Sequence, residues 1–377
     1  MTKAVFETST FADVMKRAAA VAPTRGDSFD KAAGVLLDVA PDTGTVVVRA
    51  TDTAIFYMEA LSFVKLEGND TQWRLPSILL NGFASKLPIG SGNTITLDDE
   101  VEPPKVVLSC NRTKAKLNTL DPTYFPHWDA IEVDQMFQVA DFGGAVKQVL
   151  WAASNNIDVL SGVAIDSSGV WTTDRFRAAH ATRDIGDDWE SRVVVPGKLL
   201  SKVLPDKGEL SIGMIDGAFV VQPNEFTQIR TVIFDQPYPP VERLLGQEFD
   251  YKSFFDRDAF MEMLGRAGDF TLGSRQNALK MYIGRGEVAL MMNNQEYGLF
   301  GDVLDCAGSA ESHGRIEIAF KPENLRDAIG TYPNKAVEMQ YNEDRTTPRK
   351  GLIKLVHGKE YAGVLQPLQD KEPDPNA

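Results

Sequence analysis

Three short segments with a helical spacing of apolar residues recur along the chain, each led by a proline. In the segment 193–206, VVVPGKLLSKVLPD, apolar residues follow Pro196 at the third, fourth and seventh positions. These positions share one face of a helix, and a proline at the first helical position leaves no hydrogen bond unmade. Similar segments follow Pro76 and Pro322, which lie 120 residues before and 126 residues after Pro196. The spacing predicts three repeats of about 120 residues, each with a proline-led helix.

A second helical pattern opens each predicted repeat. Residues 10–22, 140–154 and 257–270 place apolar side chains at helical intervals, and Thr10 is the expected N-cap of the first helix. Between the helices, apolar and β-branched runs predict antiparallel strands, and one strand pair contains a Thr-Asp dipeptide at 51–52 that recurs 122 residues later. The predicted fold class is α+β, with two helices per repeat packed on antiparallel sheet.

The repeat spacing also predicts the domain organisation. A chain of 377 residues is too long for one ordinary core. We expect domains at 1–128, 129–250 and 251–370, followed by a charged, proline-containing tail at 371–377 that its composition predicts to be disordered. No apolar run approaches the length of a bilayer, and the amino terminus lacks a charged-then-apolar signal pattern. We therefore expect a soluble, cytoplasmic protein.

No group of residues in the sequence indicates a catalytic, metal or cofactor site. The four histidines lack metal-ligand spacing, and Cys110 and Cys306 are too far apart to indicate a zinc site or a disulfide framework, so both are expected to be buried thiols. A nucleophile elbow, a phosphate-binding loop and a dinucleotide fingerprint are all missing from the sequence. Acidic pairs such as Asp98-Asp99 and Asp187-Asp188 are expected in loop-like segments. We expect no enzymatic activity, no cofactor and no metal.

The charge of the chain is distributed unevenly. The net charge of −14, from 39 basic and 53 acidic residues, argues against a nucleic-acid partner. However, each of the six predicted helices places a cation on the face away from its sheet, and these cations are Lys16, Arg17, Lys86, Lys147, Lys198, Lys202, Arg266, Lys321 and Arg326. Solvated helix faces are one explanation of this pattern. If the helices instead faced a common centre, an acidic protein would present a basic inner surface that suits a phosphate backbone without base readout.

Four motifs in order along the chain carry a family resemblance: VVVPGKLLSKVLPD, TTDRFRAAH, YPPVERLL and YAGVLQPL. Together with the triple repeat, they resemble the bacterial DNA polymerase III beta subunit, the sliding clamp, over nearly the whole chain. The resemblance implies three clamp domains per subunit and a head-to-tail homodimeric ring, in which twelve helices surround duplex DNA. It implies no catalysis, and it implies as partners a replicative polymerase and a clamp loader. It also adds Arg25, which matches a family arginine that contacts DNA.

The family has a cleft between its second and third domains that binds short linear peptides. Carried over residue by residue, the resemblance implies that this cleft is lined by Leu160, Thr173, Arg175, Phe176, Arg177, Ala178, Pro239, Arg243, Leu244, Val364, Gln366, Pro367 and Leu368. An apolar surface with cations at its rim suits a peptide with a glutamine and aliphatic or aromatic residues. Arg175 and Phe176 stand where the family usually has glycine and histidine, and Gln366 and Leu368 replace methionines, so the accepted peptide is expected to differ.

Two alternatives to a sliding clamp of a bacterium or a phage remain open at this point. A structural or assembly protein made of repeated α+β units would need no basic helix faces. An acidic hydrolase would need carboxylates that converge in one pocket, whereas the acidic pairs here fall in different loops. The cations on the helices favour the clamp over the first alternative, and the missing catalytic residues count against the second.

Overall fold

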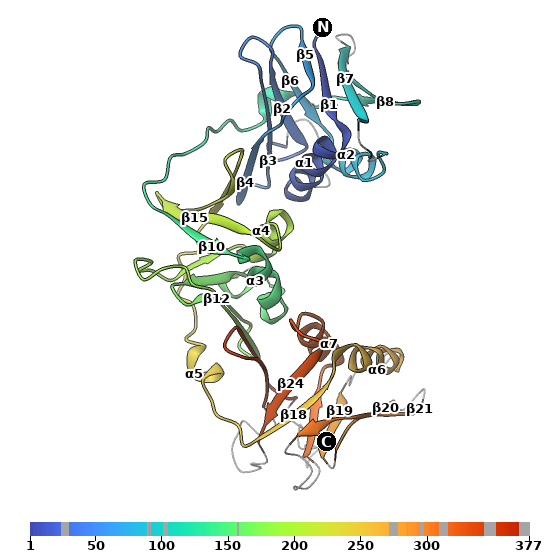
Figure 1. Cartoon of the computed structure of the whole chain (residues 1–377), viewed down its shortest axis with the longest axis vertical. Coiled ribbons are helices and arrows are strands. Elements are labelled where there is room, and N and C mark those ends of the chain that lie inside the picture. Colours follow the sequence, from blue (N-terminus) through green and yellow to red (C-terminus); the bar gives the residue numbers. More distant parts are fainter. Residues whose placement is uncertain are drawn as a thin grey trace, which may run out of the picture. The chain divides into compact units, whose positions relative to one another are not determined.

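The computed structural model describes most of the chain, as two compact units (Figure 1). The described residues are 1–23, 30–88, 90, 92–100, 105–156, 158–270, 278–284, 286–294, 298–308, 316–342 and 352–368. The first unit is Met1–Gly143 with Val195–Ile233, and the second is Gly144–Val194 with Phe234–Ala377. The predicted contact residue Arg25 and the predicted tail 371–377 lie outside the described residues.

The same order of elements recurs three times along the chain. The first repeat comprises β1 (Lys3–Glu7), α1 (Thr8–Val21), β2 (Val35–Ala40), β3 (Thr45–Thr51), β4 (Ile55–Ala60), β5 (Lys65–Glu67), β6 (Thr71–Leu75), α2 (Ser77–Ala84), β7 (Thr94–Glu100), β8 (Lys105–Cys110) and β9 (Thr113–Asn118). The second comprises β10 (Met136–Ala140), α3 (Phe142–Val149), β11 (Val163–Asp166), β12 (Gly169–Thr173), β13 (Arg177–Thr182), β14 (Val193–Val195), α4 (Gly197–Val203), β15 (Glu209–Ile215), β16 (Ala218–Asn224) and β17 (Thr227–Val232). The third comprises β18 (Tyr251–Asp256), α6 (Arg257–Asp269), β19 (Leu279–Gly284), β20 (Glu287–Asn294), β21 (Gly298–Asp305), β22 (Ala307–Gly308), β23 (Ile316–Phe320), α7 (Pro322–Gly330), β24 (Ala336–Tyr341), β25 (Ile353–His357) and β26 (Tyr361–Leu365). A short helix, α5 (Glu242–Leu245), precedes the third repeat.

The three proline-led helices are confirmed as α2, α4 and α7. In each of them a backbone carbonyl accepts a hydrogen bond from a fully buried leucine four residues later, in the pairs Pro76 with Leu80 (3.1 Å), Pro196 with Leu200 (3.2 Å) and Lys321 with Leu325 (3.4 Å). The proline therefore stands just before the first helical residue in α2 and α4, and at the first helical residue in α7. The buried leucine fixes which side of each helix faces the sheet.

The starts of the first two leading helices correct the sequence-based prediction. A strand that the apolar pattern did not reveal precedes each leading helix: β1, β10 and β18. The helix α1 consequently begins at Thr8 rather than at Thr10, without a side-chain cap, and α3 begins at Phe142 rather than at residue 140. These strands have five or six residues. At that length a strand cannot be told from a helix by periodicity, and pairing with the distant β7, β15 and β24 decides the outcome.

Each repeat forms two four-stranded sheets with different strand orders, and both orders recur in all three repeats. The strand orders β1-β7-β8-β9, β10-β15-β16-β17 and β18-β24-β25-β26 are equivalent, and so are β4-β3-β2-β6, β13-β12-β11-β14 and β21-β20-β19-β23. All pairings whose registers are described are antiparallel. The fold class is therefore α+β with mainly antiparallel sheet, as predicted.

Two of these sheets continue from one repeat into the next. The strand β17 pairs with β4 to give an eight-stranded sheet, and β26 pairs with β13 to give a nine-stranded sheet. Each compact unit contains one of these joined sheets. Because these sheets are shared, the boundaries of the compact units do not coincide with those of the predicted domains 1–128, 129–250 and 251–370. The division into three domains stays a prediction.

Repeated helices pack against one another within each unit (Figure 1). In the first unit, α1 contacts both α2 and α4, and it buries Phe11, Met15 and Ala18. In the second unit, α6 contacts α7. Cys110 is buried as expected, but Cys306 is only half-buried, which corrects that prediction. No helix in the described part of the chain has the length and apolar character needed to cross a membrane.

Candidate peptide and nucleic-acid interfaces

Two tight turns with the same hydrogen bonds mark equivalent places in the first and second repeats. In turns 51–55 and 173–177 the threonine hydroxyl donates to the carbonyl four residues on, over 2.7 and 2.6 Å. The next residue, an aspartate, accepts from the N–H groups two and three residues further on, at 2.7 to 3.0 Å. The third residue has a positive φ in both turns, 79° at Thr53 and 78° at Arg175. The 122-residue recurrence of Thr-Asp is thus a structural repeat.

Arg177 gives the second turn side-chain interactions that the first turn lacks. Its guanidinium donates to Asp174 Oδ2 (2.9 Å) and to Asn324 Oδ1 of α7 (3.1 Å), and it is only 8% exposed. In the first turn the equivalent residue is Ile55, which is fully buried. Because that turn forms without a guanidinium, the arginine is not required by the turn. The Arg177 side chain lies on the opposite face of β13 from its neighbour Ala178, since successive side chains alternate along a strand.

Part of the predicted peptide cleft is a hydrophobic cluster on the nine-stranded sheet. Ala178 and Val364, which oppose each other on β13 and β26, pack in this cluster with Leu244 of α5. Trp171, Val241 and Leu245 belong to the same cluster, and α5 contacts both β13 and β26. The resemblance named three residues that belong to this hydrophobic cluster, in which Ala178 and Val364 are fully buried, and their contact with a peptide stays a prediction. It did not include Trp171, whose only sequence signal was its position two residues before a Thr-Asp pair.

The other predicted cleft residues divide into buried and accessible groups. Leu160, Thr173 and Arg177 are buried, and the Thr173 N–H donates to the hydroxyl of Tyr238 (2.8 Å). The accessible group comprises Arg175, Phe176 and Arg243, which are exposed, and Pro239, Gln366, Pro367 and Leu368, which are half-buried. The Gln366 N–H donates to the carbonyl of Phe176 (2.9 Å), which ties the turn to the carboxyl-terminal segment. The accessible group is the part of the predicted cleft that solvent reaches.

An aromatic and ionic cluster borders the apolar surface. His180 stacks on Trp171, with ring centroids 3.6 Å apart and 15° between the planes. The Arg192 guanidinium carbon lies over the Trp171 ring, 5.4 Å from the ring centroid. Arg192 also forms ion pairs with Asp166 and Glu242. Burial lowers the pKa of His180 to about 4. The imidazole is therefore neutral at physiological pH.

The predicted DNA-facing cations differ in how accessible they are. Lys16, Lys86, Lys198, Lys202, Lys321 and Arg326 are exposed, and Lys147 is half-buried. Arg17 is held by Glu59 on β4 (2.7 Å), and Arg266 by Asp302 on β21 (2.6 Å). Of the adjacent pair on α1, Lys16 is thus the residue with an exposed side chain, and Arg17 is anchored to the sheet. Contact of any of these cations with DNA stays a prediction.

The helices of the two units differ in charge. Lys198 and Lys202 are the only charged residues of α4, and α2 has none, with Lys86 just beyond its end. In contrast, α7 carries Glu323 and Asp327 beside Arg326. Burial raises the pKa of Asp327. The helices of the first unit are therefore the more positive ones.

Other possible sites carry less information. A cavity of about 360 Å³ lies over β10, β15 and β16 of the first unit, and its lining comprises Gln138, Glu209, Leu210, Ser211, Gln222, Pro223, Asn224 and Glu225. It contains none of the residues predicted to bind a peptide or DNA. Within the described ranges, no group of three or more histidine, cysteine, aspartate or glutamate side chains is placed to hold a metal ion.

These features define a class of protein: an α+β chain of three repeated strand–helix units whose sheets are shared between neighbouring repeats. Searches with the sequence and the structure then place the chain within that class. No family model matches. The beta sliding clamp of Pseudomonas aeruginosa is 21% identical over 312 residues, which cover 78% of this chain and 81% of that protein.

Solved structures match over nearly the whole chain. The DNA polymerase III beta subunit of Thermotoga maritima has a TM-score of 0.81 at 19% identity, over 98% of this chain and 100% of that one. The DNA polymerase sliding clamp of Bacillus subtilis has a TM-score of 0.76 at 16% identity, over 98% and 99%. The chain is thus similar in sequence to a beta sliding clamp, and it has the fold of the solved DNA polymerase III beta subunits over 98% of its length.

Proposed function

We propose that the chain is a DNA sliding clamp, a processivity factor that acts in the cytoplasm of a bacterium or of a phage-infected cell. Two copies form a head-to-tail ring around duplex DNA and tether a DNA polymerase to it. The names of the similar proteins, beta sliding clamp and DNA polymerase III beta subunit, support this role. The clamp has no chemistry of its own and acts as an accessory subunit of the polymerase.

The observation that carries the proposal is a pair of unjoined sheet edges. Within the chain, the last strand of each later repeat pairs with a strand of the repeat before it. In both cases the partner is the fourth strand of its repeat in sequence order, so that β17 pairs with β4 and β26 pairs with β13. Both junctions have the same register, with Ile55 opposite Thr231 and Arg177 opposite Leu365. The equivalent edges left over are β9 and β21, which end their sheets in the described part of the chain. Pairing β9 of one copy with β21 of another repeats the internal junction between copies.

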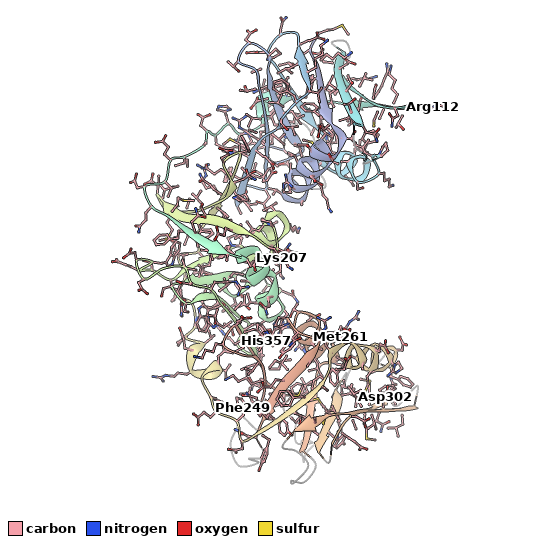
Figure 2. All side chains as sticks on the ribbon, in the orientation of Figure 1. Arg112, Lys207, Phe249, Met261, Asp302 and His357 are labelled. Atoms are coloured by element: carbon pink, nitrogen blue, oxygen red, sulfur yellow. The ribbon has the colours of Figure 1, made fainter. Side chains whose placement is uncertain are left out.

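The charges on these two edges are complementary. The exposed Lys114 and Lys116 lie on β9, and Asp305 lies on β21 with the exposed Leu299 and Val303 on the same face. Arg112, in the turn before β9, adds a further exposed positive charge at this edge (Figure 2). Opposite charges favour the pairing of β9 with β21 and disfavour the pairing of either edge with itself. The edges therefore favour head-to-tail assembly.

The exposed cations on the helices supply the DNA-facing surface of the proposed ring. Two copies bring together twelve of the repeated helices, with Lys16, Lys198 and Lys202 on the helices of the first unit. Lysine side chains that contact phosphates without reading bases suit a protein that moves along DNA. A ring needs no tight DNA contact, because its hold on DNA is topological.

Partner proteins are proposed to bind at the apolar surface beside the Thr173–Arg177 turn. Its accessible residues come from the turn, from α5 and from the segment 366–368. Short peptide motifs of a replicative polymerase and of a clamp loader are the expected ligands, in keeping with a small apolar surface that has cations at its rim.

The test is retention on DNA of defined topology. The protein is loaded with a compatible clamp loader on nicked circular plasmid, the plasmid is then linearised, and release is followed at moderate salt. Retention on circles with loss from linear DNA is the expected result. Equal retention on circular and linear DNA would mean ordinary electrostatic binding. Assembly into open filaments instead of dimers would favour the structural-protein alternative, because a head-to-tail contact that does not close into a ring gives a filament.

A further inference from the structure

The cavity over β10, β15 and β16 has a lining that is rich in hydrogen-bond acceptors. It lies within the first unit, and its lining brings together two carboxylates, three side-chain amides and one hydroxyl. None of the described lining residues is a lysine, an arginine or a histidine. The carboxylates belong to Glu209 and Glu225, which are exposed and form no ion pair in the described part of the chain. These charges favour a cationic ligand over an anionic one.

A row of polar side chains crosses the three strands of the cavity. Gln138, Ser211 and Gln222 lie directly opposite one another on neighbouring strands, and side chains in such a row share one face of the sheet. Gln138 Nε2 donates a hydrogen bond to Ser211 Oγ (2.7 Å), which orients this amide. The amide keeps its carbonyl oxygen as an acceptor. The row therefore adds neutral acceptors to the two carboxylates.

The fold itself does not require this polar row. In each repeat a backbone N–H at or just before the start of the leading helix donates to the carbonyl just before β7, β15 or β24, over 2.7 to 3.0 Å. This shared bond aligns the repeats, and the residues equivalent to the row are Val5, Thr96 and Ser109 in the first repeat and Phe254, Glu338 and Val356 in the third. The equivalent sheets thus form without a single glutamine at these positions. We infer no structural need for the two glutamines of the second repeat.

An exposed aromatic residue follows Glu225 in the turn between β16 and β17. Phe226 is 59% exposed. Its N–H donates to Asn224 Oδ1 (2.9 Å), and its carbonyl accepts from the N–H of Ala60 (2.8 Å). Because Asn224 and Glu225 line the cavity, these bonds hold the Phe226 backbone beside it. A flat cation can stack on an aromatic ring while its edge donates to carboxylates.

We propose that this cavity binds an arginine side chain of a partner protein. A guanidinium carries five N–H donors and no acceptor, which matches a lining of carboxylate, amide and hydroxyl oxygens. Glu209 and Glu225 supply the opposite charge, and Phe226 supplies a ring for stacking. A lysine ammonium has fewer donors and no flat face, so it fits this lining less well. The inference goes beyond the proposed clamp role and uses none of the residues assigned to it.

The test is an NMR titration of the full ¹⁵N-labelled chain with blocked pentapeptides that carry one central residue between glycines. The central residue is arginine, lysine or citrulline, which keeps the shape of arginine without its charge. Side-chain amide signals of Gln138 and Gln222, assigned with the variants Gln138→Ala and Gln222→Ala, report binding at the cavity. The arginine peptide is expected to bind about tenfold more tightly than the citrulline peptide and about threefold more tightly than the lysine peptide.

Three variants separate the contributions of charge, shape and stacking. Glu209→Gln with Glu225→Gln keeps the shape and is expected to weaken the arginine peptide about tenfold and the citrulline peptide less than about twofold. Ser211→Tyr fills the cavity but keeps both carboxylates, and it is expected to weaken the arginine peptide at least about tenfold. Phe226→Ala is expected to weaken the arginine peptide about threefold. Circular dichroism checks that each variant is folded.

A matched control removes the same amount of charge elsewhere. Asp187→Asn with Asp188→Asn takes two exposed carboxylates from the loop between β13 and β14 of the second unit, and it is expected to leave every affinity unchanged. If this control weakens the arginine peptide as much as the cavity variant does, binding follows net charge alone and the proposal is overturned.

Three other outcomes would also overturn the proposal. Equal affinity for the arginine and citrulline peptides, or binding of neither, would remove the cation site. Equal affinity for the arginine and lysine peptides would overturn the assignment to a guanidinium. Unchanged arginine affinity in Ser211→Tyr would place the peptide outside the cavity. Retention on circular DNA is expected to be unchanged in all these variants, so failure of the arginine site leaves the proposed ring intact.

Discussion

At the residue scale, the neutral histidine on Trp171 makes a pH-dependent contribution to stability. Burial lowers the pKa of His180 from 6.5 to about 4 in the folded protein. The unfolded chain therefore binds a proton below pH 6.5 that the folded chain does not, and stability is lost as the pH falls from about 6.5 to about 4. From the size of the shift, the loss is about 3 kcal/mol in the free energy of unfolding.

Comparison of wild type with His180→Gln isolates this contribution. The difference between their free energies of unfolding is expected to decrease by about 3 kcal/mol between pH 7 and pH 4, because every other titrating group is common to both. Urea unfolding at a series of pH values gives the difference, and the NMR titration of the His180 ring gives the midpoint directly. A midpoint near 6.5 would contradict the argument.

Sequence reasoning could not have found this contribution. Trp171 and His180 are paired across β12 and β13, so their stacking depends on strand register. In the sequence, the histidine is merely one of four without metal spacing. The predicted cleft residues show the same limit, because β13 turns Ala178 into the apolar cluster and Arg177 towards α7.

At the element scale, the two Thr-Asp turns form a natural matched pair. Asp52→Ala removes the acceptor of two backbone hydrogen bonds, at 3.0 and 2.9 Å, and is expected to cost about 1–2 kcal/mol. Asp174→Ala removes the equivalent bonds and also leaves the buried Arg177 without its carboxylate, so a cost of about 3–5 kcal/mol is expected.

The double variant Asp174→Ala with Arg177→Ile separates the two costs. Isoleucine is the native residue at the equivalent position of the first turn, so the double variant is expected to regain most of the difference. Native-state hydrogen exchange of amides in β4 and β13 measures each turn within its own unit. Equal costs for the two single variants would show that the Arg177 ion pair adds no stability.

The elements themselves were predictable to different degrees. The three proline-led helices follow from local spacing and a local steric rule, and all three occur in the structure. The strands β1, β10 and β18 carry too few residues to show a period, and they exist because a distant strand supplies their hydrogen-bond partners.

At the scale of the whole molecule, the proposed ring predicts that the charges on the open sheet edges affect dimer formation. A chain with Lys114→Glu and Lys116→Glu has two acidic edges, and a chain with Val303→Lys and Asp305→Lys has two basic ones. Each alone is expected to be monomeric, with dimer affinity at least about 100-fold weaker, because like charges then face each other along the paired strands. Analytical ultracentrifugation measures both.

An equimolar mixture of the two variants is the decisive control. It restores opposite charges at both junctions and is expected to recover the dimer. Continued dimerisation of either variant alone would contradict a junction between β9 and β21. Failure of the mixture would show that the substitutions act through folding rather than through charge.

The sequence by itself determined the repeat, the α+β class and the positions of the proline-led helices, because helix periodicity and proline geometry act over a few residues. It also determined which residues are cations, but the structure decided that Arg17 and Arg266 are held by carboxylates from distant strands. The tertiary structure alone decided that sheets continue between repeats, and so which edges stay open. Hydrogen bonding between strands depends on pairing and register, which residues far apart in the chain fix together and no local pattern encodes.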